Sequence, residues 1–317
     1  MKDYQKTVKE SYIFEGKGLH TGLHCKMTIL PAPADHGIVF KRIDLGEENF
    51  VEASWRNVGG TSRSTALCKE GVEIMTIEHL LAAFSGLGID NALVTLNSVE
   101  LPILDGSSRP YVEAILADGL ELQNVPRRYL GVKEPFLFED PSTGSSIQVF
   151  PAEKLSFEVE IDYDSKVLGV QQAQFTEGDD FSLQIAPCRT FCFFHELEFL
   201  LNHNLIKGGD MDNAIVIVEN DVDDKTLNRM KSIFHVENLE RVPEGYLNNL
   251  TLHFDNECAR HKLLDLMGDF ALAARPLKAR IIARKPGHAI NTTALKAMFE
   301  NNNIVCSGAG CEEVPSI

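Results

Sequence analysis

The sequence contains no long uninterrupted apolar run, although 44% of its 317 residues are hydrophobic. Its most apolar helix-length stretch, residues 80–96, is interrupted by Ser85, Gly86 and Asp90, whereas a membrane-spanning helix needs about 20 consecutive apolar residues. The start of the chain also lacks the apolar core of a secretory signal. We therefore expect a cytoplasmic protein without a transmembrane segment.

Cysteine pairs with metal-binding or redox spacing are also missing. The seven cysteines are odd in number and contain no CxxC motif. The simplest interpretation of this pattern is that the cysteines are reduced thiols in a cytoplasm.

Basic residues are in deficit, because 30 Lys and Arg stand against 46 Asp and Glu, for a net charge of −16. A nucleic-acid partner would favour a basic face, so the composition argues against a general nucleic-acid partner. A few well-placed cations can still attract a small anionic substrate.

The length suits about two domains of roughly 150 residues each. Residues 124–128, Asn-Val-Pro-Arg-Arg, have the composition of a linker. The predicted organisation is an N-terminal domain at 1–124, a C-terminal domain at 128–299 and a loose tail at 300–317.

Strands precede helices in each half, which favours an α+β fold over a doubly wound sheet. Thr76 is a candidate N-cap and Gly86 a candidate stop for the first helix. The expected strands are 25–30, 37–42, 91–96, 129–137, 146–150, 155–161, 213–218 and 279–284, and the expected helices are 76–84, 111–117, 193–201, 259–274 and 292–299.

Three segments carry residues suited to catalysis. Glu78 and His79 share one helix with many apolar residues, so they form a narrow polar edge of that helix. The ordinary alternative is that both side chains simply face solvent. His261 and Asp265 are four residues apart, which places them on one helix face about 6 Å apart along the axis. A surface pair supporting the helix remains the ordinary alternative.

The third segment, residues 285–288, ends with a histidine in a predicted turn. Loops often present catalytic groups, although a lone loop histidine is more often simply exposed. Together the segments offer two imidazoles and a carboxylate for a metal, with a further carboxylate, histidine and lysine. A hydrolytic zinc site needs three protein ligands, an open position, a base and an acid.

Eight ordered motifs make the chain similar to the UDP-3-O-acyl-N-acetylglucosamine deacetylases over about residues 5–299. They are Gly18–Gly22, Pro31–Pro33, Thr76–Ala83 with Gly88–Ala92, Pro102–Ser107, Arg189–Phe191, Gly208–Gly209 with Asp212–Val216, Arg260–Asp269 and Gly287–Asn291. The resemblance implies two similar layered α+β domains with zinc between them. It also implies removal of acetate from a UDP-acyl-amino-sugar, the committed step of lipid A biosynthesis. We expect a monomer unless the chain is fused to a dehydratase domain.

The resemblance also assigns the central residues. His79, His261 and Asp265 correspond to the ligands of Zn²⁺, Glu78 to the general base and His288 to the general acid.

Further roles follow from the same motifs. Thr190 corresponds to a hydroxyl that holds the developing oxyanion, and Lys262 lies near the scissile group or the substrate. Asp269 orients and charge-stabilises the general acid. Phe191 is expected to contact substrate, and Gly209 lies in the segment that resembles the acyl-chain passage.

Two stretches depart from the common pattern. Residues 62–67 lack the cysteine that many relatives carry beside the acyl passage, which bears on local substrate and inhibitor contacts and not on the metal site. Residues 162–165 resemble the variant that is fused ahead of a 3-hydroxyacyl-carrier-protein dehydratase. No dehydratase sequence follows, so a free-standing form and a piece of a fused chain both remain open.

The sequence gives less support to other classes of function. The glycines of residues 16–22 have the wrong spacing for a dinucleotide fingerprint, and the HExxH motif of zinc peptidases is absent. A catalytically inactive UDP-lipid-binding module remains the alternative, which metal content and acetate release would distinguish from an enzyme.

Overall fold

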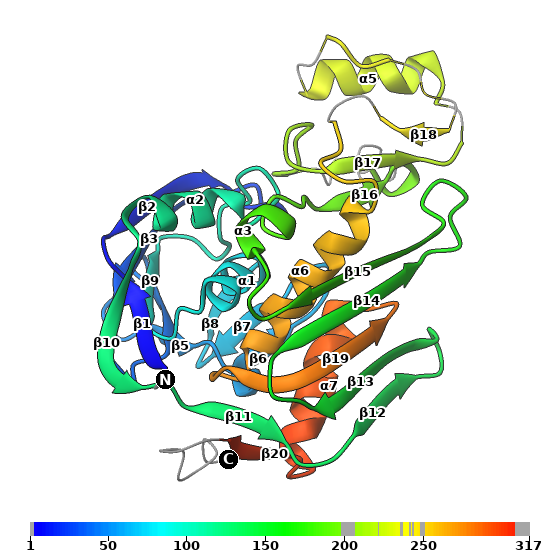
Figure 1. Ribbon diagram of the computed structural model, residues 1–317. Helices are drawn as coiled ribbons and strands as arrows, with labels where there is room; N and C mark the ends of the chain where they lie inside the picture. The colour runs from blue at the N-terminus through cyan, green and yellow to red at the C-terminus, as the bar shows by residue number, and fades with distance from the viewer. Residues whose placement is uncertain are drawn as a thin grey trace.

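The computed structural model describes residues 3–197, 207–220, 222–234, 237–240, 242, 244–247 and 251–307. Within these ranges the chain is a mixed α+β fold (Figure 1), as predicted. None of the described helices is long and apolar enough to cross a membrane.

The N-terminal half is built on a five-stranded sheet. Its strand order is β2 (Tyr12–Lys17), β3 (His24–Pro31), β9 (Ala92–Leu96), β4 (Ile38–Arg42) and β5 (Phe50–Glu52). Along β3, Cys25, Met27 and Ile29 are buried and the residues between them are more exposed. This period of two gives the sheet one apolar face.

Smaller elements complete this half. They are β1 (Tyr4–Val8) paired with β10 (Leu120–Pro126), the sheet of β6 (Val58–Gly60), β7 (Ala66–Lys69) and β8 (Val72–Met75), the short helix η1 (Trp55–Asn57), and the helices α1 (Glu78–Leu87) and α2 (Arg109–Asp118).

The C-terminal half contains a seven-stranded sheet. Its members are β11 (Tyr129–Val132), β12 (Phe136–Asp140), β13 (Ser145–Pro151), β14 (Ser156–Asp162), β15 (Val170–Thr176), β19 (Leu277–Arg284) and β20 (Ile304–Ser307). Its helices are α3 (Phe181–Gln184), α6 (Glu257–Ala271) and α7 (His288–Glu300). Helix α6 packs on α1, β14 and β15, so α1 and α6 lie side by side between the two halves (Figure 1).

A separate small unit lies at one end of α6 (Figure 1). It consists of β16 (Phe191–Phe193), β17 (Ile215–Val218), β18 (Gly245–Tyr246) and α5 (Asp224–Phe234). Phe194, Leu197 and Met211 are buried in its own apolar core. Ordinary packing therefore accounts for these three side chains in the segment that resembles the acyl-chain passage. The neighbouring apolar residues Phe199, Leu200, Leu205 and Ile206 lie outside the described residues.

The predicted limits of the first helix were wrong. Thr76 is not its N-cap, because the Thr76 backbone has φ +59° and its hydroxyl donates to buried Glu100 at 2.9 Å. Gly86 does not stop the helix either. It is a helical residue packed so closely on the Phe181 ring that a Cβ would lie 2.3 Å from it, and the left-handed Gly88 (φ +71°) ends the helix instead.

Several other elements have limits that differ from the predicted ones. The expected linker begins as strand, because β10 continues to Pro126, and the expected strand 129–137 is two strands, β11 and β12. Helix 193–201 begins at Phe194, and its residues from 198 onward lie outside the described ranges. The division into 1–124 and 128–299 stays a proposal.

The chain after residue 300 is not simply a loose tail. Residues 304–307 form β20, which pairs antiparallel with β11. The expectation of seven reduced thiols was also wrong, because Cys306 is disulfide-bonded, whereas Cys25, Cys68, Cys188, Cys192 and Cys258 are free.

Candidate metal centre and active site

The close approach of α1 and α6 builds the site. Gly268 on α6 faces the backbone of Glu78 on α1, so closely that a Cβ at Gly268 would lie 2.1 Å from the Glu78 carbonyl oxygen. Asp265 is one helical turn before Gly268, and His79 follows Glu78 directly. The bare glycine therefore lets the two helices bring His79 and Asp265 together.

Gly268→Ala is expected to lower both thermal stability and metal affinity. Alanine favours a helix by about 1 kcal/mol over glycine, but overpacking a core costs about 1–3 kcal/mol, and the new methyl group meets backbone that cannot rotate away. Thermal unfolding and metal titration would measure the two effects. Gly60→Ala is the control, because its Cβ would meet only Ala66 at 3.7 Å; equal melting temperatures for both variants would contradict the packing argument.

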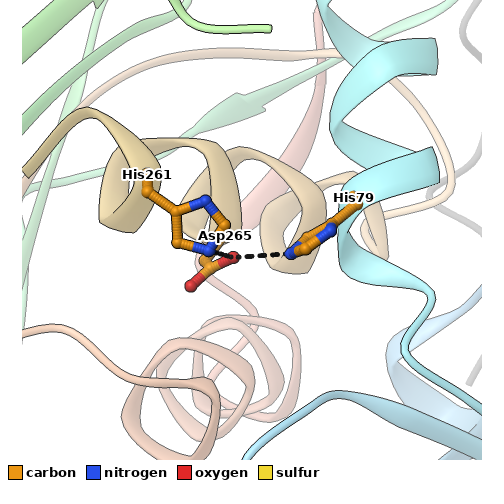
Figure 2. A group of neighbouring side chains, drawn as sticks. All are labelled: His79, His261 and Asp265. Carbon is orange, nitrogen blue, oxygen red and sulfur yellow. Dashed lines mark ion pairs between the residues drawn. The ribbon is translucent and has the colours of Figure 1, made fainter. Parts of the chain in front are cut away.

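His79, His261 and Asp265 converge on one point from the two helices (Figure 2). The Asp265 Oδ1 atom lies 3.4 Å from His261 Nε2 and 3.7 Å from His79 Nε2. The two imidazole rings are nearly perpendicular, with centroids 5.1 Å apart. Zinc ligands at about 2.0–2.2 Å in a tetrahedron are separated by about 3.3–3.6 Å, which is close to these distances.

The surrounding hydrogen bonds leave the right atoms free for a cation. The Nδ1–H group of His261 donates to the Cys188 carbonyl at 3.0 Å, so its Nε2 lone pair faces Asp265. Lys262 Nζ donates to Asp265 Oδ2 at 2.8 Å. Among the described residues, the buried Asp265 Oδ1 atom has no hydrogen-bond donor. Because an unsatisfied buried acceptor is costly, this atom fits a metal ion.

The charge states also suit a metal. Burial, together with the neighbouring His261, lowers the pKa of His79 to about 3. Burial lowers the pKa of His261 as well. Burial opposes ionisation of Asp265, but His261 and Lys262 hold its pKa well below its usual value. Two neutral imidazoles and one carboxylate form a ligand set that zinc uses in proteins, although other divalent ions also accept it.

An acid–base pair lies beside these three residues. Burial raises the pKa of Glu78 to about 7. Burial alone would lower the pKa of His288, but the Asp269 and Glu78 carboxylates raise it to about 9. His288 Nδ1 lies 3.0 Å from Asp269 Oδ2, and Nε2 lies 3.8 Å from Glu78 Oε1 and 3.9 Å from Asp265 Oδ2. The His288 Nε2 atom therefore faces the cluster.

His288 is not in a turn, as its sequence predicted, but is the first residue of α7. Its side chain is 8% exposed and Asp269 is fully buried. A buried, paired imidazole on a helix is held more firmly than one on a mobile loop.

Of the residues expected to contact substrate, the structure places Phe191 and Lys262 beside the cluster but shows few contacts of Thr190 and Gly209. The Phe191 ring lies edge-on to His261, with centroids 6.4 Å apart, and Lys262 Nζ sits 5.5 Å from the Phe191 centroid. Thr190 directly precedes Phe191, and its backbone N–H donates to Gly106. The hydrogen bonds of the described residues include none from the Thr190 hydroxyl, and Gly209 only approaches Leu19. The roles of Thr190 and Gly209 stay predictions.

The sequence reasoning missed two polar residues that contact Asp269. Asn291 Nδ2 donates to Asp269 Oδ2 at 2.9 Å, and Thr65 Oγ1 lies 2.5 Å from Asp269 Oδ1. Asn291 was detectable, because residues three apart on a helix share a face and it follows His288 by three. Thr65 gave no such signal, since 204 residues separate it from Asp269.

The fold and the site define an α+β protein with a buried three-residue candidate metal centre and an adjoining acid–base pair, which is the plan of hydrolytic zinc sites. The chain belongs to the UDP-3-O-acyl N-acetylglycosamine deacetylase family, whose model matches residues 5–237 and 240–300.

Individual relatives show the same family. The chain is 45% identical over 294 residues to the bifunctional enzyme LpxC/FabZ of Bacteroides thetaiotaomicron, a match over 93% of this chain and 64% of the relative. The bifunctional enzyme of Porphyromonas gingivalis is 44% identical over 90% of this chain and 62% of its own. The UDP-3-O-acyl-N-acetylglucosamine deacetylase of Cellvibrio japonicus is 37% identical over 94% of this chain and 91% of its own. The chain thus spans just under two thirds of the bifunctional relatives.

Proposed function

We propose that the chain hydrolyses the N-acetyl group of UDP-3-O-(3-hydroxyacyl)-N-acetylglucosamine to acetate and the free amine, the committed step of lipid A biosynthesis. The observation that carries the proposal is the buried His79, His261 and Asp265 triangle, with Glu78 and His288 beside it. Family membership and the names of the relatives support the identity of the substrate. The proposed setting is the cytoplasm, and the proposed form is a monomer.

The proposed cofactor is Zn²⁺, held by His79, His261 and Asp265. A bound zinc ion supplies Lewis acidity, polarising the amide carbonyl and making a water molecule acidic near neutral pH. The orphaned Asp265 Oδ1 atom and the neutral imidazoles support this assignment.

The chain's own residues supply the proton transfers. Glu78, as a carboxylate, accepts a proton from the attacking water. His288 is protonated at neutral pH because Asp269 and Glu78 raise its pKa to about 9, and its Nε2–H group donates to the departing amine, which would otherwise leave as an unstable anion. Lys262 and Thr190 are the proposed donors to the oxyanion that develops on the carbonyl oxygen.

Acetate release from the acylated UDP-sugar by purified, zinc-loaded protein tests the proposal. Acetate and the free amine should form in equal amounts. Tight binding of the UDP-lipid without acetate would instead identify the inactive binding module.

The acyl chain is expected to contribute strongly to kcat/KM. Phe191 and Phe193 are only partly buried and stack edge-on with Tyr163 near the candidate site, so apolar surface remains available there. Each buried methylene contributes about 0.8 kcal/mol, or roughly fourfold in kcat/KM if it is realised in the transition state. The comparison is UDP-N-acetylglucosamine with and without its 3-O-acyl chain, followed by stepwise shortening; equal values would reject an acyl passage.

A further inference from the structure

Thr65 is a fully buried residue that joins the two halves of the site. It lies just before β7 in the N-terminal half, and its backbone is bound to the start of α1 at two points. Its N–H group donates to Glu78 Oε2 at 3.1 Å, and its carbonyl accepts from Ile77 N–H at 3.4 Å. Its hydroxyl reaches α6 and α7 in the other half.

The hydroxyl has only one arrangement that satisfies its neighbours. Its oxygen lies 2.5 Å from Asp269 Oδ1, a distance typical of an O–H group that donates to a carboxylate. Its lone pairs then face His288 Nδ1 at 3.1 Å. The Nδ1–H group of His288 is therefore shared between Thr65 Oγ1 and Asp269 Oδ2, which lies 3.0 Å away.

Asp269 is consequently held at both carboxylate oxygens. Thr65 binds Oδ1, while Asn291 and His288 bind Oδ2. If the Thr65 hydroxyl is lost, the carboxylate keeps hydrogen bonds from the described part of the chain at only one oxygen. It can then rotate about its side-chain torsion. Such rotation would turn the His288 ring, whose Nε2 faces Glu78 and Asp265.

We propose that Thr65 is a positioning residue, which fixes the general base through its backbone N–H and the Asp269–His288 pair through its hydroxyl. It thereby sets the orientation of the acid relative to the base across the interface between the two halves. Its effect on turnover rests on the proposed function, whereas its effect on the His288 ring does not.

Thr65→Val is the decisive substitution, because valine keeps the shape and the backbone contacts but removes the hydroxyl. Loss of an outer-shell partner at a metal site typically costs about 10–100-fold in metal affinity or activity, and Thr65 supports the pair that adjoins the candidate metal centre. We expect kcat to fall by about this factor, with KM for the acylated sugar and the zinc content little changed. Thr65→Ser restores the hydroxyl and should recover most of the kcat.

Thr7→Val is the matched control. Thr7 is also buried, and its hydroxyl accepts one hydrogen bond, from Ala32 N–H at 3.1 Å. It should lose stability without losing kcat. A wild-type kcat in Thr65→Val, or a Thr65→Ser variant as slow as Thr65→Val, would overturn the proposal.

A second measurement separates this proposal from the function itself. In ¹⁵N-histidine spectra of zinc-loaded protein, the His288 ring signals, assigned with His288→Ala, should move in Thr65→Val and stay in place in Thr65→Ser. If the wild type releases no acetate, the proposed function fails and these spectra alone decide the role of Thr65; unchanged His288 signals in Thr65→Val would refute it. If Thr65→Val does not fold, the smaller Thr65→Ala takes its place in both measurements.

Discussion

Replacing His79 or His261 with alanine is expected to empty the protein of zinc and to abolish acetate release. Each substitution removes one of the three proposed protein ligands. It also leaves Asp265 Oδ1, which has no hydrogen-bond donor among the described residues, with one imidazole neighbour fewer. A buried carboxylate and a single histidine cannot complete the ligand set of a zinc site. Elemental analysis of the purified variants measures the metal, and acetate release measures the activity.

His24→Ala is the control, because His24 is exposed and lies on β3, not on either of the two helices that carry the proposed ligands. It should retain one zinc per chain. Full zinc occupancy in both His79→Ala and His261→Ala would remove these residues from the ligand set, whatever the activity of the variants.

His288→Ala is expected to lower kcat by about 10²–10⁴-fold while zinc stays bound. In the proposed mechanism the rate requires deprotonated Glu78 and protonated His288. It should therefore rise as the pH passes the pKa of Glu78 and fall as the pH passes the pKa of His288. These pKa values are about 7 and about 9 without a metal, and a bound cation lowers both. Both limbs report macroscopic ionisations of the coupled site.

The alkaline limb distinguishes the role of His288 from a general loss of structure. In His288→Ala the fall in rate at alkaline pH should disappear, because the group that titrates there is gone. A variant that keeps the wild-type alkaline limb would exclude His288 as the acid. Unchanged metal content would confirm that the loss of kcat does not come from the metal site.

The strongly patterned elements were predictable from local sequence. Helix α6 and strands β9 and β19 appeared within a few residues of their expected bounds, because long periodic or β-branched runs dominate local preference. The errors occurred where a distant partner overrides such a preference. Glu100 takes the Thr76 hydroxyl that the sequence assigned to a helix cap, and pairing with β11 orders residues 304–307.

The candidate ligands and the proposed acid and base could be named from the chain alone. The motifs contain all of them, and the helical repeat sets His261 and Asp265 on one face. Only tertiary packing decided how α1 is placed relative to α6 and α7, and therefore which of their side chains meet. Gly268 allows the approach that joins His79 to Asp265, and Thr65 reaches Asp269 across 204 residues. Burial among these carboxylates, which no local pattern encodes, moves the pKa values of Glu78 and His288 away from their ordinary values. Local spacing follows from backbone geometry, whereas convergence depends on contacts between segments far apart in the chain.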